Sequence, residues 1–472
     1  MPPATDLALA VEPLRQLLGA DSVSTNAADL LPYLEDERGA FHGRAHVLVQ
    51  PASTDAVARL LAYCSEHAIG IVPQGGNTGY CGAGTPFSDA HILLKLDRMN
   101  RVRELSKTNF TMTAETGVTL QRVKDEALAA GLDFPLSLGS QGSCQLGGVL
   151  STNAGGLNAL RYGVARDLVL GLEVVLPDGR VLNRAQGLRK DNTGYRWCDL
   201  FLGAEGTLGV ITAASIKLMP LLQGRATALL AFATLSGASA GLLHFRQACD
   251  DSVVAFELLT QGSIDLATAL GQGSRLPVSA ESGLMVLVEV AADTSERATE
   301  RLEAALQPAM EQGLVIDGAL ASSLSQRESL WRFREDVPEA EKRAGGSIKH
   351  DVSLPVQHLE AFVNETVDRL RAFEGARLSV FGHLGDGNLH FNVLAPAGAD
   401  AQQWRHHNGS AVTETVLAAV AEFGGSFSAE HGIGVSKLDE LERYRSDELG
   451  LMQALKAVFD PLGIMNPGKV LR

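Results

Sequence analysis

Two histidines in the segment FGHLGDGNLHFN, residues 381–392, could hold a metal ion. Strand-like runs flank the Asp-Gly pair at 386–387, which is a strong signal for a two-residue hairpin turn. With that turn, His383 pairs directly with His390, so both imidazoles lie on one face of the hairpin. Two imidazoles at that separation could bind one cation such as zinc. The alternative is an ordinary hairpin with two surface histidines, and a longer loop would shift the pairing.

The segment SAEHG adds an acid and a further histidine, Glu430 and His431. A carboxylate would complete a site of two histidines and one acid, which leaves coordination positions open for a substrate. Because imidazole titrates near neutral pH, His431 could serve as a general base next to such a site. The alternative is a purely structural histidine.

Two glycine-rich segments, residues 70–84 and 135–156, suggest a second ligand. Glycine lets backbone N–H groups approach a phosphate closely, because no Cβ stands in the way. Neither nucleotide-binding template fits: the first segment lacks the third glycine of a Rossmann loop, and the Walker-like run GIMNPGK at 463–469 is followed by Val470 instead of Ser or Thr. The segments therefore predict a dinucleotide-like ligand that is bound by neither of these two motifs.

The elements around these segments indicate two domains. Residues 53–67 read as a capped helix, short strands recur at 70–74 and 91–96, and an Asp-Gly hairpin signal lies within 168–183. Residues 43–220 therefore read as one α+β unit. Beyond Pro220, strands alternate with long helices, which favours a sheet with helices on one face.

The composition narrows the class of protein. The net charge of −15, from 40 basic and 55 acidic residues, argues against nucleic-acid binding. No apolar run approaches the roughly 20 residues that span a bilayer. Five scattered cysteines without a CxxC pair indicate a reducing compartment and no disulfide framework. The first residues resemble neither a signal peptide nor a transit peptide, so we predict a soluble cytoplasmic protein.

The motifs PQGGNTG, GGVLSTNAGG, GAEGTLGVIT and NPGK resemble the FAD-binding domain of the vanillyl-alcohol oxidase/p-cresol methylhydroxylase flavoprotein superfamily. Within it, the chain resembles the D-2-hydroxyacid dehydrogenases, from about residue 43 to the end and with the motifs in the family's order. The resemblance implies noncovalent FAD, because Asn77-Thr78 stands where some relatives tether the flavin through a histidine. The residues that the resemblance assigns to FAD are Pro73, Gln74, Gly75, Gly76, Asn77, Thr78, Ser137, Gly139, Ser140, Gly142, Ser143, Gly147, Gly148, Thr152, Asn153, Val210, Ile211 and Asn466.

The same resemblance gives the histidine hairpin a role. The family's GHxGDGNLHxN and AEHG motifs supply a divalent metal site, and His383, His390 and Glu430 match its ligands, with zinc the expected ion. His431 matches the family's proposed base.

Three further residues resemble substrate contacts. Arg334 and Lys349 match cationic residues that contact substrate in D-2-hydroxyglutarate dehydrogenases, and Asn392 could orient the substrate carboxylate. Arginine suits bidentate carboxylate binding. Pro338 stands where the family often has Thr or Ser, so one hydroxyl donor is lost.

The resemblance implies an α+β fold with a two-subdomain FAD-binding domain, a substrate domain built on an antiparallel sheet covered by helices, and a C-terminal helical segment. The expected boundaries are 1–42, 43–220, 221–421 and 422–472, the last segment returning to the flavin. The expected activity is FAD- and metal-dependent oxidation of a D-2-hydroxyacid by hydride transfer to flavin N5. D-2-hydroxyglutarate is favoured, with an electron-transfer flavoprotein or quinone as electron acceptor. The alternatives are a D-lactate- or glycolate-type dehydrogenase or oxidase, and a noncatalytic flavin-binding subunit.

Overall fold

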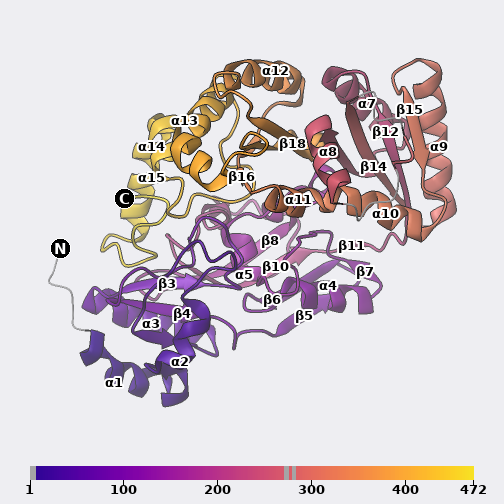
Figure 1. Cartoon of the computed structure of the whole chain (residues 1–472). Coiled ribbons are helices and arrows are strands. Elements are labelled where there is room, and N and C mark those ends of the chain that lie inside the picture. Colours follow the sequence, from indigo (N-terminus) through magenta and orange to yellow (C-terminus); the bar gives the residue numbers. More distant parts are fainter. Residues whose placement is uncertain (1–6, 271–275, 279–282) are drawn as a thin grey trace. The chain divides into compact units, whose positions relative to one another are not determined.

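The computed structural model describes residues 7–270, 276–278 and 283–472. The chain divides into two compact units. Unit 1 comprises residues 1–156, 162–221 and 430–472, and unit 2 comprises 157–161 and 222–429. Each unit combines sheets with helices, so the predicted α+β class is confirmed (Figure 1).

The first sheet of unit 1 has the order β1-β2-β4-β3, with β2, β4 and β3 parallel. Its strands are β1 (Val23–Ser24), β2 (Val47–Val49), β4 (His91–Lys95) and β3 (Gly70–Gln74). Helices α1 (Leu7–Leu18) and α3 (Thr54–His67) share an apolar core with it. Ser53 caps α3 by accepting a hydrogen bond from the N–H of Ala56, which confirms the predicted helix.

The second sheet of unit 1 is antiparallel, in the order β5-β6-β10-β8-β9. Its strands are β5 (Val102–Ser106), β6 (Thr111–Glu115), β10 (Val210–Lys217), β8 (Val169–Val175) and β9 (Val181–Asn183). The predicted Asp178-Gly179 hairpin joins β8 to β9, with Gly179 at φ +86°. The remaining elements of this region are α4 (Leu120–Ala129), α5 (Leu146–Ser151) and the strand pair β7 (Leu132–Asp133) and β11 (Met219–Pro220).

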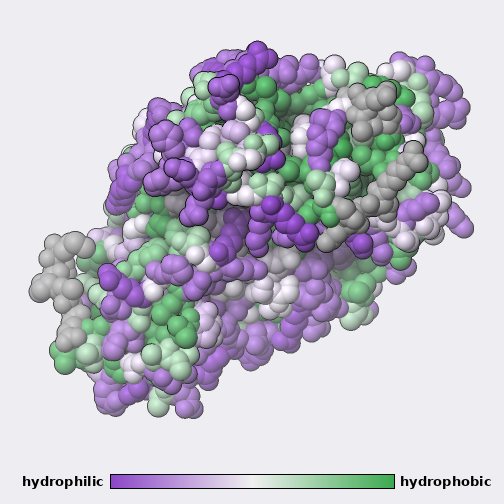
Figure 2. Space-filling view, viewed as in Figure 1, coloured by the Kyte–Doolittle hydropathy of each residue, from purple (hydrophilic) through white to green (hydrophobic). Residues whose placement is uncertain are grey.

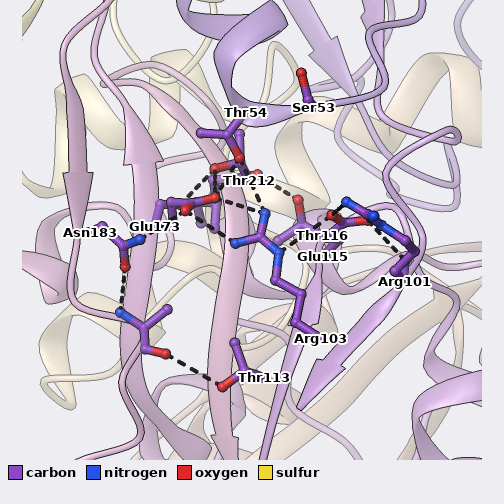
Figure 3. A network of polar contacts seen from close by, with 12 residues as sticks. Ser53, Thr54, Arg101, Arg103, Thr113, Glu115, Thr116, Glu173, Asn183 and Thr212 are labelled. Carbon is purple, nitrogen blue, oxygen red and sulfur yellow. Dashed lines mark hydrogen bonds and ion pairs between the residues drawn. The ribbon is translucent and has the colours of Figure 1, made fainter.

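A buried polar network fastens α3 to this second sheet (Figure 3). Arg103 donates to Glu173 at 3.0 and 3.1 Å, and its Nε lies 3.4 Å from Glu115. Glu173 also accepts from Thr54, the first residue of α3, at 2.6 Å. Burial acts to raise the pKa of Glu173, but these hydrogen bonds and the Arg103 charge lower it. The carboxylate therefore stays ionised and paired, as a buried charge requires.

The last segment of the chain lies within unit 1. It contains α14 (Leu438–Tyr444) and α15 (Ser446–Phe459). Beyond α15, Ile464 and Asn466 exchange backbone hydrogen bonds with Ile71 of β3 at 2.7 Å. The closing NPGK run is therefore fixed beside the first glycine-rich segment.

Unit 2 is built on an eight-stranded antiparallel sheet. Its main path is β15 (Asp317–Leu320), β12 (Gly224–Ala231), β14 (Leu284–Ala292), β13 (Val253–Thr260), β18 (Arg377–His383), β19 (Asn388–Leu394) and β16 (Ser347–Ile348), and β17 (Asp351–Ser353) also pairs with β19. Its helices are α7 (Leu235–Ala248), α8 (Gln261–Ala269), α9 (Ser295–Glu311), α10 (Leu324–Glu335), α11 (Val337–Arg343), α12 (Leu359–Leu370) and α13 (Ala401–Glu422).

Helices cover both faces of this sheet, so the predicted coverage of one face is wrong. Leu229 packs in one apolar cluster with Leu330 of α10. The next residue of β12, Leu230, points to the other face, where it lies with Leu306 of α9 against Gly318. The strands are apolar at successive positions, which is the pattern of a sheet buried on both sides. Figure 2 shows hydrophilic side chains along the outer edge of α9.

Two further observations concern the cysteines and the helices of the described residues. All five cysteines are free and buried. No helix among residues 7–270, 276–278 and 283–472 is both long and apolar enough to cross a bilayer.

Candidate active site

The histidine hairpin forms, but in a different register from the predicted one. His383 pairs with Asn388 and Phe381 with His390, so the predicted direct pair of His383 with His390 is wrong. The cause is a longer loop: residues 384–386 form a 3-10 turn, and Gly387 follows at φ +79°. The two histidines are now diagonal neighbours on one face, and their ring centroids lie 5.8 Å apart.

Each imidazole has an acidic neighbour within unit 2. His383 Nδ1 lies 2.7 Å from Glu257 Oε1, and His390 Nδ1 lies 4.0 Å from Asp351 Oδ1. Because an ionised carboxylate only accepts hydrogen bonds, His383 Nδ1 donates to Glu257. A histidine ligand in a metal site typically donates its other ring N–H to a carboxylate, so His383 fits a ligand of a divalent ion.

The predicted substrate residues contact two buried glutamates. Arg334 Nε donates to Glu257 Oε2 at 3.1 Å, and the guanidinium lies over the ring of Phe381 at 4.8 Å. Burial acts to raise the pKa of Glu257, but the charges of His383 and Arg334 and their hydrogen bonds lower it to about 2. This glutamate is therefore ionised at neutral pH.

A second buried glutamate, Glu341 of α11, holds the other two predicted substrate residues. Asn392 Nδ2 donates to its two carboxylate oxygens at 2.9 and 3.1 Å. Lys349 Nζ lies 3.9 Å from Oε2 of the same residue, with the lysine side chain about half exposed. The Asn392 amide is therefore engaged inside unit 2, with its Oδ1 accepting from the N–H of His350 at 3.2 Å.

Unit 1 contains a cavity of about 530 Å³ where the two glycine-rich segments meet. The residues predicted for FAD that line it are Pro73, Gln74, Gly75, Gly76, Asn77, Thr78, Gly139, Ser140, Gly147, Gly148, Thr152, Val210 and Ile211. Among the described residues, five others predicted for FAD lie off this lining, namely Ser137, Gly142, Ser143, Asn153 and Asn466. Further lining residues that were not predicted to bind FAD include Glu37, Tyr80, Thr85, Thr116, Gln145, Ser151 and Glu205.

Glu430 and His431 line the same cavity of unit 1. The His431 ring packs edge-on against Tyr80, with centroids 4.7 Å apart. Two residues further on, the N–H groups of Ile433 and Gly434 donate to the buried carboxylate of Glu205 at 2.6 and 2.8 Å. Glu205 therefore fixes the backbone just beyond the candidate base.

Two family models match the chain. One is described as the FAD binding domain and matches residues 45–184, and the other, the C-terminal domain of FAD linked oxidases, matches residues 221–470. The chain is 36% identical over 458 residues to the mitochondrial D-2-hydroxyglutarate dehydrogenase of Arabidopsis thaliana. The matched region covers 97% of this chain and 80% of the relative. The chain is 40% identical to the Bos taurus enzyme of that name, over 95% of this chain and 81% of the relative. The chain belongs to the FAD-dependent D-2-hydroxyacid dehydrogenase family.

The fold is similar to that of p-cresol methylhydroxylase. The structure of p-cresol methylhydroxylase with substrate bound matches with a TM-score of 0.73 at 16% sequence identity, over 98% of this chain and 96% of that one. At this identity the likeness concerns the fold alone.

The cavity of this family member fits FAD. A Cβ on Gly139 would meet nothing within 4 Å, so the backbone there is open to a close ligand. Gly76 instead allows the two glycine-rich segments to pack closely, because a Cβ on it would lie 2.1 Å from the carbonyl oxygen of Ser143 in the second segment. Two buried oxygens on the lining, Gln74 Oε1 and Gln145 Oε1, have no hydrogen-bond partner among the described residues. They are acceptors that the amino or hydroxyl groups of FAD could satisfy.

Strained backbone surrounds the flavin cavity. Asn77 and Glu205 on its lining adopt φ of +57° and +49°. Asn153, next to the lining residue Thr152, adopts +50°, and Asn466 adopts +43°. Positive φ is uncommon outside glycine and costs free energy, so it persists where surrounding contacts fix it. Asn466 illustrates this: its Nδ2 donates to the carbonyl oxygens of Ala83 and Glu205. Asn466 thus holds the loops of the cavity together from behind the lining.

The predicted cytoplasmic location is wrong. The relatives from Arabidopsis thaliana and Bos taurus are named as mitochondrial enzymes, which points to mitochondria instead. The prediction depended on scattered cysteines, which indicate a reducing compartment, and on first residues that resemble neither a signal peptide nor a transit peptide. Cysteine usage does not distinguish one reducing compartment from another.

Glu257 is the main residue of this family member's site that sequence reasoning missed. A signal was present, because it is a single acid within the otherwise apolar strand VVAFELLT. A charge in such a strand is buried and must be paired. Its partners, however, lie about 77 and 126 residues further along the chain, and the sequence does not show which they are.

Proposed function

We propose that the chain oxidises a D-2-hydroxyacid to the 2-oxoacid, with D-2-hydroxyglutarate as the favoured substrate, using noncovalent FAD and a divalent metal ion, zinc by preference. The observation that supports this most is the lining of the unit 1 cavity, which includes both the glycine-rich segments and the Glu430-His431 pair. Relatives at 36% and 40% identity are named D-2-hydroxyglutarate dehydrogenases.

When bound, FAD would accept at N5 the hydride that leaves C2 of the substrate. A divalent ion, when bound, would lower the pKa of the hydroxyl that it holds. In this proposal the imidazole of His431 removes the hydroxyl proton. A positioned general base contributes roughly 10²–10⁴-fold to a rate.

Unit 2 supplies the two proposed histidine ligands, His383 and His390, and the proposed substrate residues. Glu430, the first residue of the last segment of unit 1, is the proposed third ligand. Chain connectivity supports Glu430, since the N–H of Ala429 donates to the carbonyl oxygen of Asp351 at 3.3 Å. Glu430 follows Ala429 directly, so their Cα atoms are about 3.8 Å apart. Asp351 in turn pairs with His390 in the sheet.

Arg334 and Lys349 favour a dicarboxylate, and Asn392 supports them. Only the Nε of Arg334 donates a hydrogen bond within the described chain, so its Nη groups can bind a second substrate carboxylate as a bidentate pair. Pro338 occupies the second position of α11, where a family hydroxyl would otherwise stand. Because that donor is lost, D-lactate and glycolate remain alternative substrates.

The electron acceptor in this proposal is an electron-transfer flavoprotein or a quinone. An oxidase that passes electrons to oxygen is the alternative. A noncatalytic flavin-binding subunit is a second alternative, which the paired Arg334, Glu257 and His383 argue against, because such a network has no use in a flavin carrier.

A dye-reduction assay with both enantiomers of 2-hydroxyglutarate, lactate, malate and glycolate tests the proposal. We expect turnover with the D enantiomers, highest for D-2-hydroxyglutarate. Absence of turnover with every 2-hydroxyacid by a protein loaded with FAD and zinc would contradict it.

A further inference from the structure

Glu257 is a buried carboxylate at the centre of the unit 2 sheet. It lies on β13, is 1% exposed, and pairs with His383 of β18 and Leu287 of β14. The face that it shares with Leu287 also carries Leu229 and Phe381, which belong to one apolar cluster. An ionised side chain there is costly unless every oxygen is paired.

The two oxygens of Glu257 have different partners. Oε1 accepts from His383 Nδ1 at 2.7 Å, and Oε2 accepts from Arg334 Nε at 3.1 Å. The first bond fixes the ring orientation of His383 and directs Nε2 away from the carboxylate. The second fixes the guanidinium of Arg334 by one edge, and the ring of Phe381 supports its face at 4.8 Å.

We propose that Glu257 is a positioning residue that couples the metal ligand His383 to the substrate cation Arg334. The inference rests on the proposed function, since it takes His383 as a ligand and Arg334 as a carboxylate contact. One rigid carboxylate holds both groups, so a change at Glu257 alters metal affinity and dicarboxylate preference together. If Glu257 only neutralised the buried charge of Arg334, a substitution at Glu257 would change the stability of the fold alone.

The sheet offers a matched control in Glu289 of β14. Its side chain is also buried, at 5% exposure, and its carboxylate accepts from Arg327 of α10 at 2.8 and 3.1 Å. Trp331 Nε1 and Thr227 Oγ1 complete its hydrogen bonds at 2.7 Å each. Glu289 thus shares the strand environment and the arginine partner of Glu257, but its hydrogen-bond partners include no histidine among the described residues.

The experiment compares Glu257→Gln and Glu289→Gln with the wild type as FAD-loaded full-length proteins. Each protein is stripped with a chelator, and its zinc dissociation constant is measured by competition with a chromophoric chelator. Glutamine keeps the size of the side chain but offers an N–H₂ group to one of the two donors. We expect Glu257→Gln to bind zinc roughly 10- to 100-fold more weakly, the effect usual for losing the carboxylate behind a histidine ligand. Glu289→Gln should bind zinc like the wild type.

A second measurement separates coupling from a role at the histidine alone. The ratio of kcat/KM for D-2-hydroxyglutarate to that for D-lactate should fall several-fold in Glu257→Gln, although Arg334 is intact, and stay constant in Glu289→Gln. If Glu257→Gln does not fold, the same two measurements are made on Glu257→Asp, whose side chain is too short to reach both partners.

Three outcomes would overturn the inference. Unchanged zinc affinity in Glu257→Gln overturns the role at His383. Weaker zinc binding with an unchanged substrate ratio overturns the coupling to Arg334. A wild-type protein that binds no zinc overturns the metal site of the proposed function and this inference with it, and that result is distinguishable because it is seen before any substitution.

Discussion

At the scale of single residues, the proposed function makes Arg334 the residue that determines which acid the site accepts. Its Nε is occupied by Glu257, and the side chain is only 7% exposed, so it is held in one orientation. A preorganised guanidinium loses little entropy on binding a carboxylate. D-2-hydroxyglutarate has a second carboxylate to bind there, whereas D-lactate has none.

Arg334→Ala should therefore reduce kcat/KM for D-2-hydroxyglutarate far more than for D-lactate. A charge-assisted hydrogen bond contributes about 1.5–3 kcal/mol, which is roughly 10- to 150-fold in the ratio of the two specificity constants. Arg327→Ala on the same helix removes an arginine from the buried Glu289 and serves as the control. Equal losses for both acids in Arg334→Ala would assign Arg334 a structural role and remove the support for a dicarboxylate.

His383→Ala and His390→Ala should each lose bound metal and most turnover while keeping FAD. The FAD cavity lies within unit 1, and both histidines belong to the sheet of unit 2. Elemental analysis and the flavin absorbance measure the two properties separately, and prolonged chelation of the wild type should reproduce the variants. His244→Ala is the control, because the Nε2 of this histidine donates to the carbonyl oxygen of Ala305 in α9, outside the hairpin. Full metal content in both hairpin variants would contradict the assignment.

At the scale of elements, the sequence predicted strands and helices well and their partners less well. The capped helix at 53–67, the β8–β9 hairpin and both strands around His383 and His390 carry local signals, and all of them form. The register of the histidine hairpin failed by two residues because Leu384 and Gly385 join the loop, which an Asp-Gly pair alone does not reveal. Glu257 could not be connected to His383 and Arg334, because non-local pairing depends on sheet order.

The closing NPGK run of unit 1 is an element with a testable pH response. Lys469 Nζ donates to the carbonyl oxygens of Gly82 and Thr85 at 3.2 and 2.6 Å and lies over the Phe87 ring. Burial lowers the pKa of Lys469 to about 8, with the charge of Glu205 opposing the shift. The unfolded chain keeps this proton up to about pH 10.4. Between these values the unfolded state binds more protons, so this group adds stability as the pH rises.

The Tm of the wild type relative to Lys469→Met should therefore increase between about pH 8 and 9.5. The slope is at most about 1.4 kcal/mol per pH unit. Comparing the two proteins cancels the titration of groups that both contain, and Lys190→Met at an exposed position controls for the loss of one positive charge. A difference in Tm that stays constant or shrinks over this range would contradict the assigned burial of the Lys469 charge.

At the scale of the whole molecule, the FAD cavity and the proposed substrate residues belong to different units. The glycine-rich segments, the NPGK run and His431 belong to unit 1, and the proposed substrate residues Arg334, Lys349 and Asn392 belong to unit 2. FAD should accordingly stabilise unit 1 whatever residue stands at position 334 or 383. A ligand that binds the folded state alone adds about 1.4 kcal/mol for each tenfold increase in its concentration above Kd.

The purified protein should be yellow and should release intact FAD when it is precipitated with acid. Asn77 and Thr78 line the cavity at the position where some relatives carry a tethering histidine, and neither side chain can form that bond. His431 also lines the cavity, so it is one residue of the lining, with Tyr80 and Cys144, that could contradict this expectation. Chromatography of the supernatant distinguishes FAD from smaller flavins, and His431→Asn provides the control for a tether at that residue. Flavin that stays with the precipitated wild type, but is released from His431→Asn, would show a covalent bond to His431 and would rule it out as the free base that the mechanism needs.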